Sequence, residues 1–118
     1  MTDWMFFNRD EFKCPHCDRN KIEDYLVNML EDARRLAGVP FVITSGYRCP
    51  IHNMAIGGSP TSSHLKGWAV DIACETDYLR MKIFNALIHT GFHRIGVRKD
   101  FIHVDEDDDK NPVRMWVY

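Results

Sequence analysis

The chain has 118 residues, of which 45% are hydrophobic and 27% are charged, and its formal net charge at pH 7 is −2. This length predicts one domain with a real core and no second globular unit. The charge argues against nucleic acid as the main partner, and no stretch is long enough for membrane insertion. The N-terminus has no basic region typical of a secretory signal. We therefore expect a monomer made in the cytoplasm, where cysteines stay reduced.

Residues 1–20 are predicted to form an irregular arm. Its expected anchors to the core are three phenylalanines: Phe6, Phe7 and Phe12. Within the arm, Cys14-Pro15-His16-Cys17 has the cysteine spacing of half a zinc site. Cys49 and His52 could supply the other half, or the cysteines could form a disulfide after release, or the four residues could be unrelated. The sequence leaves these alternatives open.

A helix is predicted next, because apolar residues recur at helical spacing from Ile22 to Ala37. Residues 20–23 read as a variant of the capping box that would start it, and Gly38 would end it. The expected buried stripe is Ile22, Tyr25, Leu26, Met29, Leu30, Ala33, Leu36 and Ala37. The expected outer face is Glu23, Asp24, Glu31, Asp32, Arg34 and Arg35.

Residues 41–44 form a predicted strand that leads into the turn Ser45-Gly46-Tyr47-Arg48. Arg48 could be a surface cation or an anion clamp, because a guanidinium group can bind a carboxylate through two hydrogen bonds. Residues 50–56 are predicted to form a short helix with proline in its first turn. Residues 59–63 are predicted to be a loop that presents His64.

His64 and Asp71 lie on either side of Gly67. Asp71 is inside an apolar strand predicted over residues 68–73, and His64 precedes that strand. A carboxylate buried in such a strand is costly unless it is paired or bound to a metal. Histidine nitrogen and aspartate oxygen are both zinc ligands. The stretch therefore predicts that Asp71 shares a cation with His64.

A second helix is predicted from Thr76 to Gly91, with a buried stripe of Leu79, Ile83, Phe84, Leu87 and Ile88. Residues 92–97 and 101–105 form a predicted hairpin. Residues 106–109 are expected to be a solvated acidic loop. Residues 112–118 are expected to form a closing strand whose aromatic residues border a cleft beside the residues that could bind a metal.

His103 lies inside the second strand of the predicted hairpin, on the same face as Phe101 and Asp105. It can supply the third protein ligand that a catalytic zinc ion needs. Asp100 precedes it by three residues and could be a general base or an ordinary turn aspartate. Asp105 could orient His103 or belong to the acidic loop.

Three motifs follow in order along the chain: Ser45-Gly46-Tyr47-Arg48, Ser62-x-His64-x-x-Gly67-x-Ala69-x-Asp71 and Asp100-x-x-His103. Together they resemble the zinc D-Ala-D-Ala carboxypeptidase family. That family also contains the vancomycin-resistance D,D-dipeptidases and the phage L-alanyl-D-glutamate endopeptidases.

The resemblance implies a zinc ion held by three ligands: His64, Asp71 and His103. It also implies Asp100 and Arg48 as catalytic residues, with Arg48 and Ser62 contacting the substrate. That substrate would be a peptidoglycan stem peptide containing D-amino acids, cleaved by a D,D-carboxypeptidase or an L,D-endopeptidase. The enzyme would act on the cell wall after release, as a phage or prophage endolysin does.

A different class of function stays open, namely a non-catalytic domain of the same fold that binds metal or cell wall. Asp100 discriminates between the two, because a binding module has no use for a base beside the metal. For either function we expect one α+β domain over residues 1–118, with a small, mostly antiparallel sheet and two main helices packed to one side.

Overall fold

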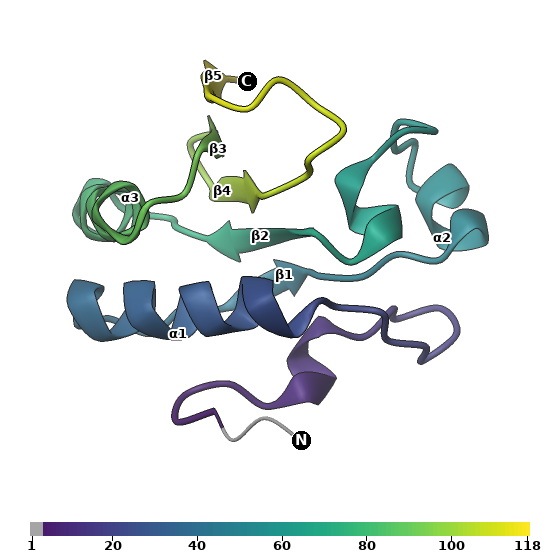
Figure 1. The fold of residues 1–118 in the computed structure, drawn as a ribbon, viewed down its shortest axis with the longest axis horizontal. Coiled ribbons are helices and arrows are strands. Elements are labelled where there is room, and N and C mark those ends of the chain that lie inside the picture. The colour runs from purple at the N-terminus through teal and green to yellow at the C-terminus, as the bar shows by residue number, and fades with distance from the viewer. Residues whose placement is uncertain (1–3) are drawn as a thin grey trace.

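A computed structural model describes residues 4–118 and contains two long helices, three short helical segments and a five-stranded sheet (Figure 1). The long helices are α1 (Asp24–Ala37) and α3 (Asp77–Thr90), which pack against each other. The short segments are η1 (Arg9–Phe12), α2 (Pro50–Ala55) and η2 (Ser63–Lys66). The strands are β1 (Ile43–Ser45), β2 (Ala69–Ala73), β3 (Arg94–Val97), β4 (Phe101–Asp105) and β5 (Arg114–Val117).

The sheet has the strand order β1-β2-β4-β3-β5, as Figure 1 shows from β1 up to β5. All neighbouring pairs are antiparallel except β3 and β5, which are parallel. The predicted α+β class with a mostly antiparallel sheet is confirmed. The register pairs Asp71 of β2 with His103 of β4, so these side chains are direct cross-strand neighbours.

Strand alternation separates a core face of the sheet from a polar face. Val70, Ile72, Ile102 and Val104 are fully buried in the main core, together with residues of both long helices. Asp71 and His103 alternate with them and therefore lie on the opposite face. The apolar half of each strand fixes the register that brings these two polar side chains together.

The N-terminal arm folds against α1, on the lower side of the molecule in Figure 1. Phe7 and Phe12 are buried and Phe6 packs against the same core, which confirms the predicted anchors. The first three residues of the predicted arm lie outside the described residues. Among the helices of the described residues, none has the length and apolar character needed to cross a membrane.

The start of α1 differs from the prediction. Glu23 precedes the helix without a capping hydrogen bond from its side chain. The Asn20 side chain instead accepts a hydrogen bond from the amide of Ile22 (3.1 Å) and donates one to the carbonyl of Arg9 (2.7 Å). The capping-box prediction is wrong because Asn20 ties the connecting segment to η1 rather than capping the helix.

Several positions of the predicted buried stripes are also wrong. Tyr25 and Leu36 of α1 and Ile88 of α3 are exposed. Each lies at the border of an apolar stripe, where helical periodicity alone does not say how far the neighbouring element reaches. Tyr25 packs instead against Trp68, with a ring-centroid distance of 6.2 Å.

Glu31 was expected on the outer face of α1 but is buried. Its carboxylate accepts three hydrogen bonds of 2.8 Å, from the backbone amides of Met5, Phe6 and Phe7. The arm covers this part of the helix, and helical periodicity carries no information about such a distant segment. Glu31 therefore holds the arm against α1.

Replacing Glu31 with alanine is expected to lower the free energy of unfolding by about 3 kcal/mol, because three amides in a part-buried region lose a charged acceptor. Urea denaturation measures this change. Asp32→Ala is the matched control, since the Asp32 side chain is exposed and forms only a surface pair with Arg35, and its cost should stay within about 0.5 kcal/mol. Equal costs for the two variants would contradict the role of Glu31.

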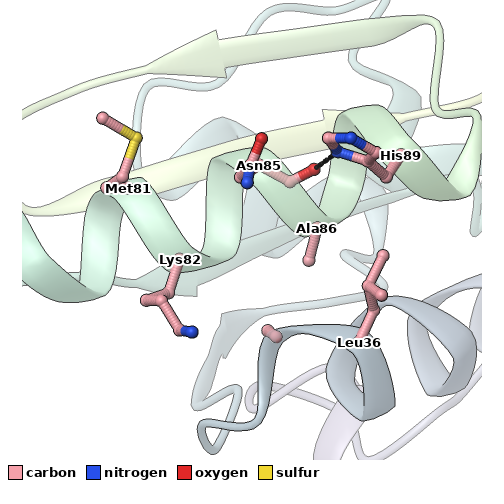
Figure 2. A pocket seen from close by; sticks show the side chains of 7 residues that line it. Leu36, Met81, Lys82, Asn85, Ala86 and His89 are labelled. Atoms are coloured by element: carbon pink, nitrogen blue, oxygen red, sulfur yellow. Dashed lines mark hydrogen bonds between the residues drawn. The ribbon is translucent and has the colours of Figure 1, made fainter.

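A shallow hollow lies between α1 and α3 (Figure 2). Its lining residues are Leu36, Ala37, Met81, Lys82, Asn85, Ala86 and His89. The hydrogen bond drawn there joins His89 Nδ1 to the carbonyl oxygen of Asn85 one turn earlier in α3 (2.8 Å). The imidazole thus bonds to its own helix near the C-terminus, where histidine is favourable, and the hollow is a gap between helix side chains.

Candidate metal centre and substrate cleft

A cleft of about 360 Å³ opens over the polar face of the sheet. Its lining comes from the turn after β1, from the loop that follows α2, from η2, from strands β2 to β5, and from Lys110 and Tyr118 on either side of β5. The residues that matter for the chemistry are Arg48, Ser62, His64, Asp71, Phe101, His103, Asp105, Trp116 and Tyr118. Five of the six site residues predicted from the sequence line this cleft, and Asp100 does not.

His64, Asp71 and His103 form a compact group whose donor atoms all lie within 4.8 Å of one another. His64 Nε2 is 3.4 Å from Asp71 Oδ1, and His103 Nδ1 is 3.0 Å from the same oxygen. All three residues are at least nine-tenths buried. The structure therefore brings together the three residues that the sequence analysis selected as metal ligands.

His64 sits in η2, which begins at Ser63, the last residue of the loop predicted to present it. The Ser62 hydroxyl caps this turn by accepting a hydrogen bond from the amide of His64 (3.2 Å). On the ring, Nδ1 lies 2.7 Å from the carbonyl oxygen of Gly46. A carbonyl can only accept, so Nδ1 carries a proton, and Nε2 is the ring nitrogen that faces Asp71.

Asp105 orients the ring of His103, so that Nδ1 rather than Nε2 faces Asp71. Nε2 of His103 donates a hydrogen bond of 2.7 Å to Asp105, which is fully buried and also accepts one from Arg94 Nε (2.7 Å). Nδ1 of His103 therefore faces Asp71. Of the two alternatives for Asp105, the structure supports the orienting contact, and the acidic loop begins after it.

The electrostatics of this group favour a cation. Burial alone would raise the pKa of Asp71, but hydrogen bonds from His103 and His64 outweigh burial and hold it well below the ordinary aspartate value. Burial would likewise lower the pKa of His103, but hydrogen bonds to Asp105 and Asp71 raise it. Two buried carboxylates thus stabilise positive charge at this point.

The donor set fits a zinc ion. It offers two imidazole nitrogens and one carboxylate oxygen, which is a ligand set of catalytic zinc sites. Each imidazole also donates its other N–H to an oxygen acceptor, Gly46 for His64 and Asp105 for His103. Such contacts fix ring orientation and tautomer around protein-bound metals.

Arg48 lies beside the group, with its side chain mostly buried. Nε donates to Ser45 Oγ (3.0 Å), Nη1 to Asn53 Oδ1 (3.3 Å) and Nη2 to Asp71 Oδ2 (3.4 Å). Each terminal nitrogen has a second N–H beyond these bonds. The guanidinium group is therefore held in place and retains donors for an anion in the cleft.

Aromatic residues form another part of the cleft lining. Trp116 of β5 packs against His103 at a ring-centroid distance of 5.5 Å, and Tyr118 packs against Phe101 at 5.3 Å. Gly96 makes room for Trp116, because a Cβ atom there would lie 2.4 Å from the indole ring. The prediction that aromatic residues of the closing strand rim the cleft is confirmed.

Asp100 directly precedes β4 and does not line the cleft. Its side chain is about half exposed and lies 3.3 Å from Arg98 Nε, and its carbonyl oxygen accepts a hydrogen bond from the amide of Cys74. The structure thus places the predicted base at the surface end of the strand, and its catalytic role stays a prediction.

The acidic segment after β4 is not wholly solvated, contrary to expectation. Asp107 is buried and accepts a hydrogen bond of 2.6 Å from Ser63 Oγ and one of 3.1 Å from Lys66 Nζ. Ser63 and Lys66 both belong to η2, on either side of His64. Asp107 therefore fixes the turn that presents His64, a role that its run of acidic neighbours concealed in the sequence.

Burial would raise the pKa of Asp107, but hydrogen bonds from Ser63, the amide of Asp109 and Lys66 hold it below the ordinary value. The stability that this carboxylate contributes is therefore present above the ordinary aspartate pKa of about 3.9 and is lost as pH falls through the lower, folded-state value.

Asp107→Asn is expected to cost about 2 kcal/mol at neutral pH and progressively less in acid. Urea denaturation across this pH range measures the difference, with Asp108→Asn, an exposed neighbour, as the control. A cost that does not change with pH would contradict this account.

A buried group of two histidines and one aspartate beneath an open cleft is typical of metal-dependent hydrolases. The family model described as Peptidase M15 matches residues 7–105, which is well over half of the chain. The protein therefore belongs to the Peptidase M15 family and is a peptidase, in a family that is in general zinc-dependent. No curated protein matches the sequence.

Proposed function

We propose that the protein is a zinc metallopeptidase that hydrolyses peptidoglycan stem peptides containing D-amino acids. The observation that carries the proposal is the buried group of His64, Asp71 and His103 at the base of a cleft that Arg48 also lines. Family membership supports the reaction class. The resemblance of the three motifs to peptidases of the bacterial cell wall supports the substrate class.

His64 through Nε2, Asp71 through a carboxylate oxygen and His103 through Nδ1 would hold the metal. Bound zinc polarises a carbonyl group and lowers the pKa of water toward about 7. The chain's own contribution is to orient both imidazole rings, through hydrogen bonds to the Gly46 carbonyl and the Asp105 carboxylate.

We assign the general base to Asp100, on its three-residue offset before His103. In this role its side chain leaves Arg98 and turns toward the cleft. The cost is small, because both partners of that ion pair are more than half exposed and exposed pairs contribute only about 0–1 kcal/mol. The carboxylate would accept a proton from water and later donate it to the leaving amine.

Arg48 would bind a carboxylate of the stem peptide through its remaining N–H groups. Burial lowers its pKa, although Asp71 opposes this, and an arginine stays charged in proteins. Ser62 caps η2 and lines the cleft, so one hydroxyl can serve the turn and contact substrate. Binding of a free C-terminus favours carboxypeptidase action, whereas a side-chain carboxylate suits an endopeptidase such as an endolysin released onto the cell wall.

Mass spectrometry of the products from purified peptidoglycan tests the proposal. The wild-type protein should release stem-peptide fragments, and a chelator should stop their release until zinc is restored. His64→Ala and Asp100→Ala should both lose turnover, and Asp100→Ala should keep its zinc. The fragment masses identify the bond and separate carboxypeptidase from endopeptidase action.

Undiminished turnover in either variant would contradict the assigned roles. A protein that sediments with peptidoglycan but releases no fragments, with or without zinc, would favour the non-catalytic binding domain instead.

A further inference from the structure

A second group of metal-binding side chains lies apart from the cleft residues, where the N-terminal arm meets the start of α2. The sulfur atoms of Cys14, Cys17 and Cys49 all lie within 4.8 Å of one another, and each is a free thiol. His16 Nδ1 is 3.6 Å from Cys49 Sγ. Two segments that are distant in sequence thus bring three sulfurs and an imidazole together.

The backbone around these cysteines is shaped to hold thiolates. Cys14 and Cys17 lie on a tight turn in which the carbonyl of Cys14 accepts a hydrogen bond from the amide of Asp18 (2.9 Å). Asp18 adopts the left-handed conformation that closes this turn, with a φ of 59°. The amide of Cys49 donates to Cys14 Sγ (3.5 Å), and that of His52 donates to Cys49 Sγ (3.4 Å).

Burial would raise the pKa of the Cys14 thiol, but backbone amides, that of Cys49 foremost, lower it to about 7. For Cys17, the backbone of Arg19 would lower the thiol pKa, but burial and the side chains of Cys14 and Cys49 raise it. The amides that point at the Cys14 and Cys49 sulfur atoms hold both atoms in place beside Cys17.

We propose that Cys14, Cys17, Cys49 and His16 bind a second zinc ion with a structural role. Three thiolates and one imidazole are a standard ligand set for structural zinc, which is four-coordinate and closed to substrate. The sequence offered His52 as a candidate for the fourth position. We assign the fourth position to His16, because its ring nitrogen lies 3.6 Å from the Cys49 sulfur.

A metal here would fasten the arm to the turn that builds the cleft. Cys49 directly follows Arg48 and caps the N-terminus of α2. Three residues earlier, Gly46 packs so closely on the arm that a Cβ atom would lie 2.6 Å from the carbonyl oxygen of Phe12. The amide of Tyr47 donates to that same oxygen (2.8 Å). The segment that orients His64 and carries Arg48 is therefore held at one end by packing against Phe12 and at the other by the proposed site.

Elemental analysis of the full chain, purified under reducing conditions, counts the metal. We expect two zinc ions per wild-type chain, and one in each of two variants, His64→Ala and Cys49→Ser. Cys74→Ala is the matched control, because Cys74 is a buried thiol outside the group, and it should retain both ions. One zinc ion in wild type that persists in Cys49→Ser would overturn the proposal.

Cobalt substitution in the His64→Ala background provides a readout that depends on neither activity nor the folding of a cysteine variant. Thiolate-to-cobalt charge-transfer bands should appear in the near ultraviolet. Adding His16→Ala should weaken cobalt affinity by at least about tenfold, whereas adding His52→Ala should leave it unchanged. Absence of these bands, or an intact mass showing a disulfide among the three cysteines, would overturn the proposal even if the peptidase assignment holds. The converse result, charge-transfer bands in this background together with an inactive wild-type protein, would overturn only the proposed function.

Discussion

Replacing Asp71 with alanine is expected to abolish peptide hydrolysis and to remove the zinc ion from the cleft. Asp71 is the residue that all the others share: His64 and His103 both approach its Oδ1, and Arg48 donates to its Oδ2. Without this carboxylate, the two imidazoles lose the oxygen ligand between them, and a buried guanidinium group loses its counter-charge. Turnover of stem peptide and zinc content measure the first effect.

The same substitution should destabilise the metal-free protein by about 3 kcal/mol, because removing one partner of a buried ion pair leaves the other uncompensated. Urea denaturation in the presence of a chelator measures this second effect. Asp71→Asn preserves the shape and should lose zinc and turnover with a smaller loss of stability. Glu75→Ala, on the same segment but exposed, should change neither. Full zinc content and turnover in Asp71→Ala would contradict the assigned centre.

Local patterns sufficed to predict the group at the base of the cleft. Alternation placed His103 on the strand face opposite Ile102 and Val104, and a carboxylate inside an apolar strand marked Asp71 as needing a partner. The antiparallel pairing of β2 with β4 brings the two residues side by side. The predicted hairpin of β3 and β4 was also correct. The period of each strand and the short connection of the hairpin are local features of the sequence, whereas the pairing of β2 with β4 spans α3 and β3.

The residues that support this group could not be predicted in the same way. Glu31 and Asp107 are charged residues within charged stretches, where a solvated face is the usual expectation. Each is buried only because a distant segment covers it, the arm over Glu31 and η2 over Asp107. The parallel pairing of β5 with β3 likewise depends on a long connection. No periodicity in the sequence reports such contacts.

The cysteine group illustrates the same limit. Cys14-Pro15-His16-Cys17 was recognisable from its spacing, but whether Cys49 would meet it depended on how the arm folds. The structure brings Cys49 close to Cys14 and Cys17, and it places the ring of His16 beside the Cys49 sulfur. Choosing between two nearby histidines requires the turn geometry, which spacing does not contain.

Replacing Gly67 with alanine is expected to be among the most destabilising single substitutions in the chain. Gly67 ends η2 in the left-handed conformation, with a φ of 77°, and its carbonyl oxygen accepts a hydrogen bond of 2.9 Å from the amide of Glu23. A Cβ atom there would lie 1.9 Å from the carbonyl oxygen of Lys21. The backbone of residues 21–23 would have to move away from the turn that carries His64.

Gly38→Ala is the matched control, because Gly38 ends α1 with a similar φ of 70° but a methyl group added there would meet nothing within 4 Å. It should cost about 1 kcal/mol, the strain of a left-handed alanine, whereas Gly67→Ala should cost more than about 3 kcal/mol because the steric overlap is added. Urea denaturation of the two variants measures the difference. Equal costs would mean that residues 21–23 move away freely. In that case, the close packing of residues 21–23 on η2 would not be needed to hold His64 beside Asp71.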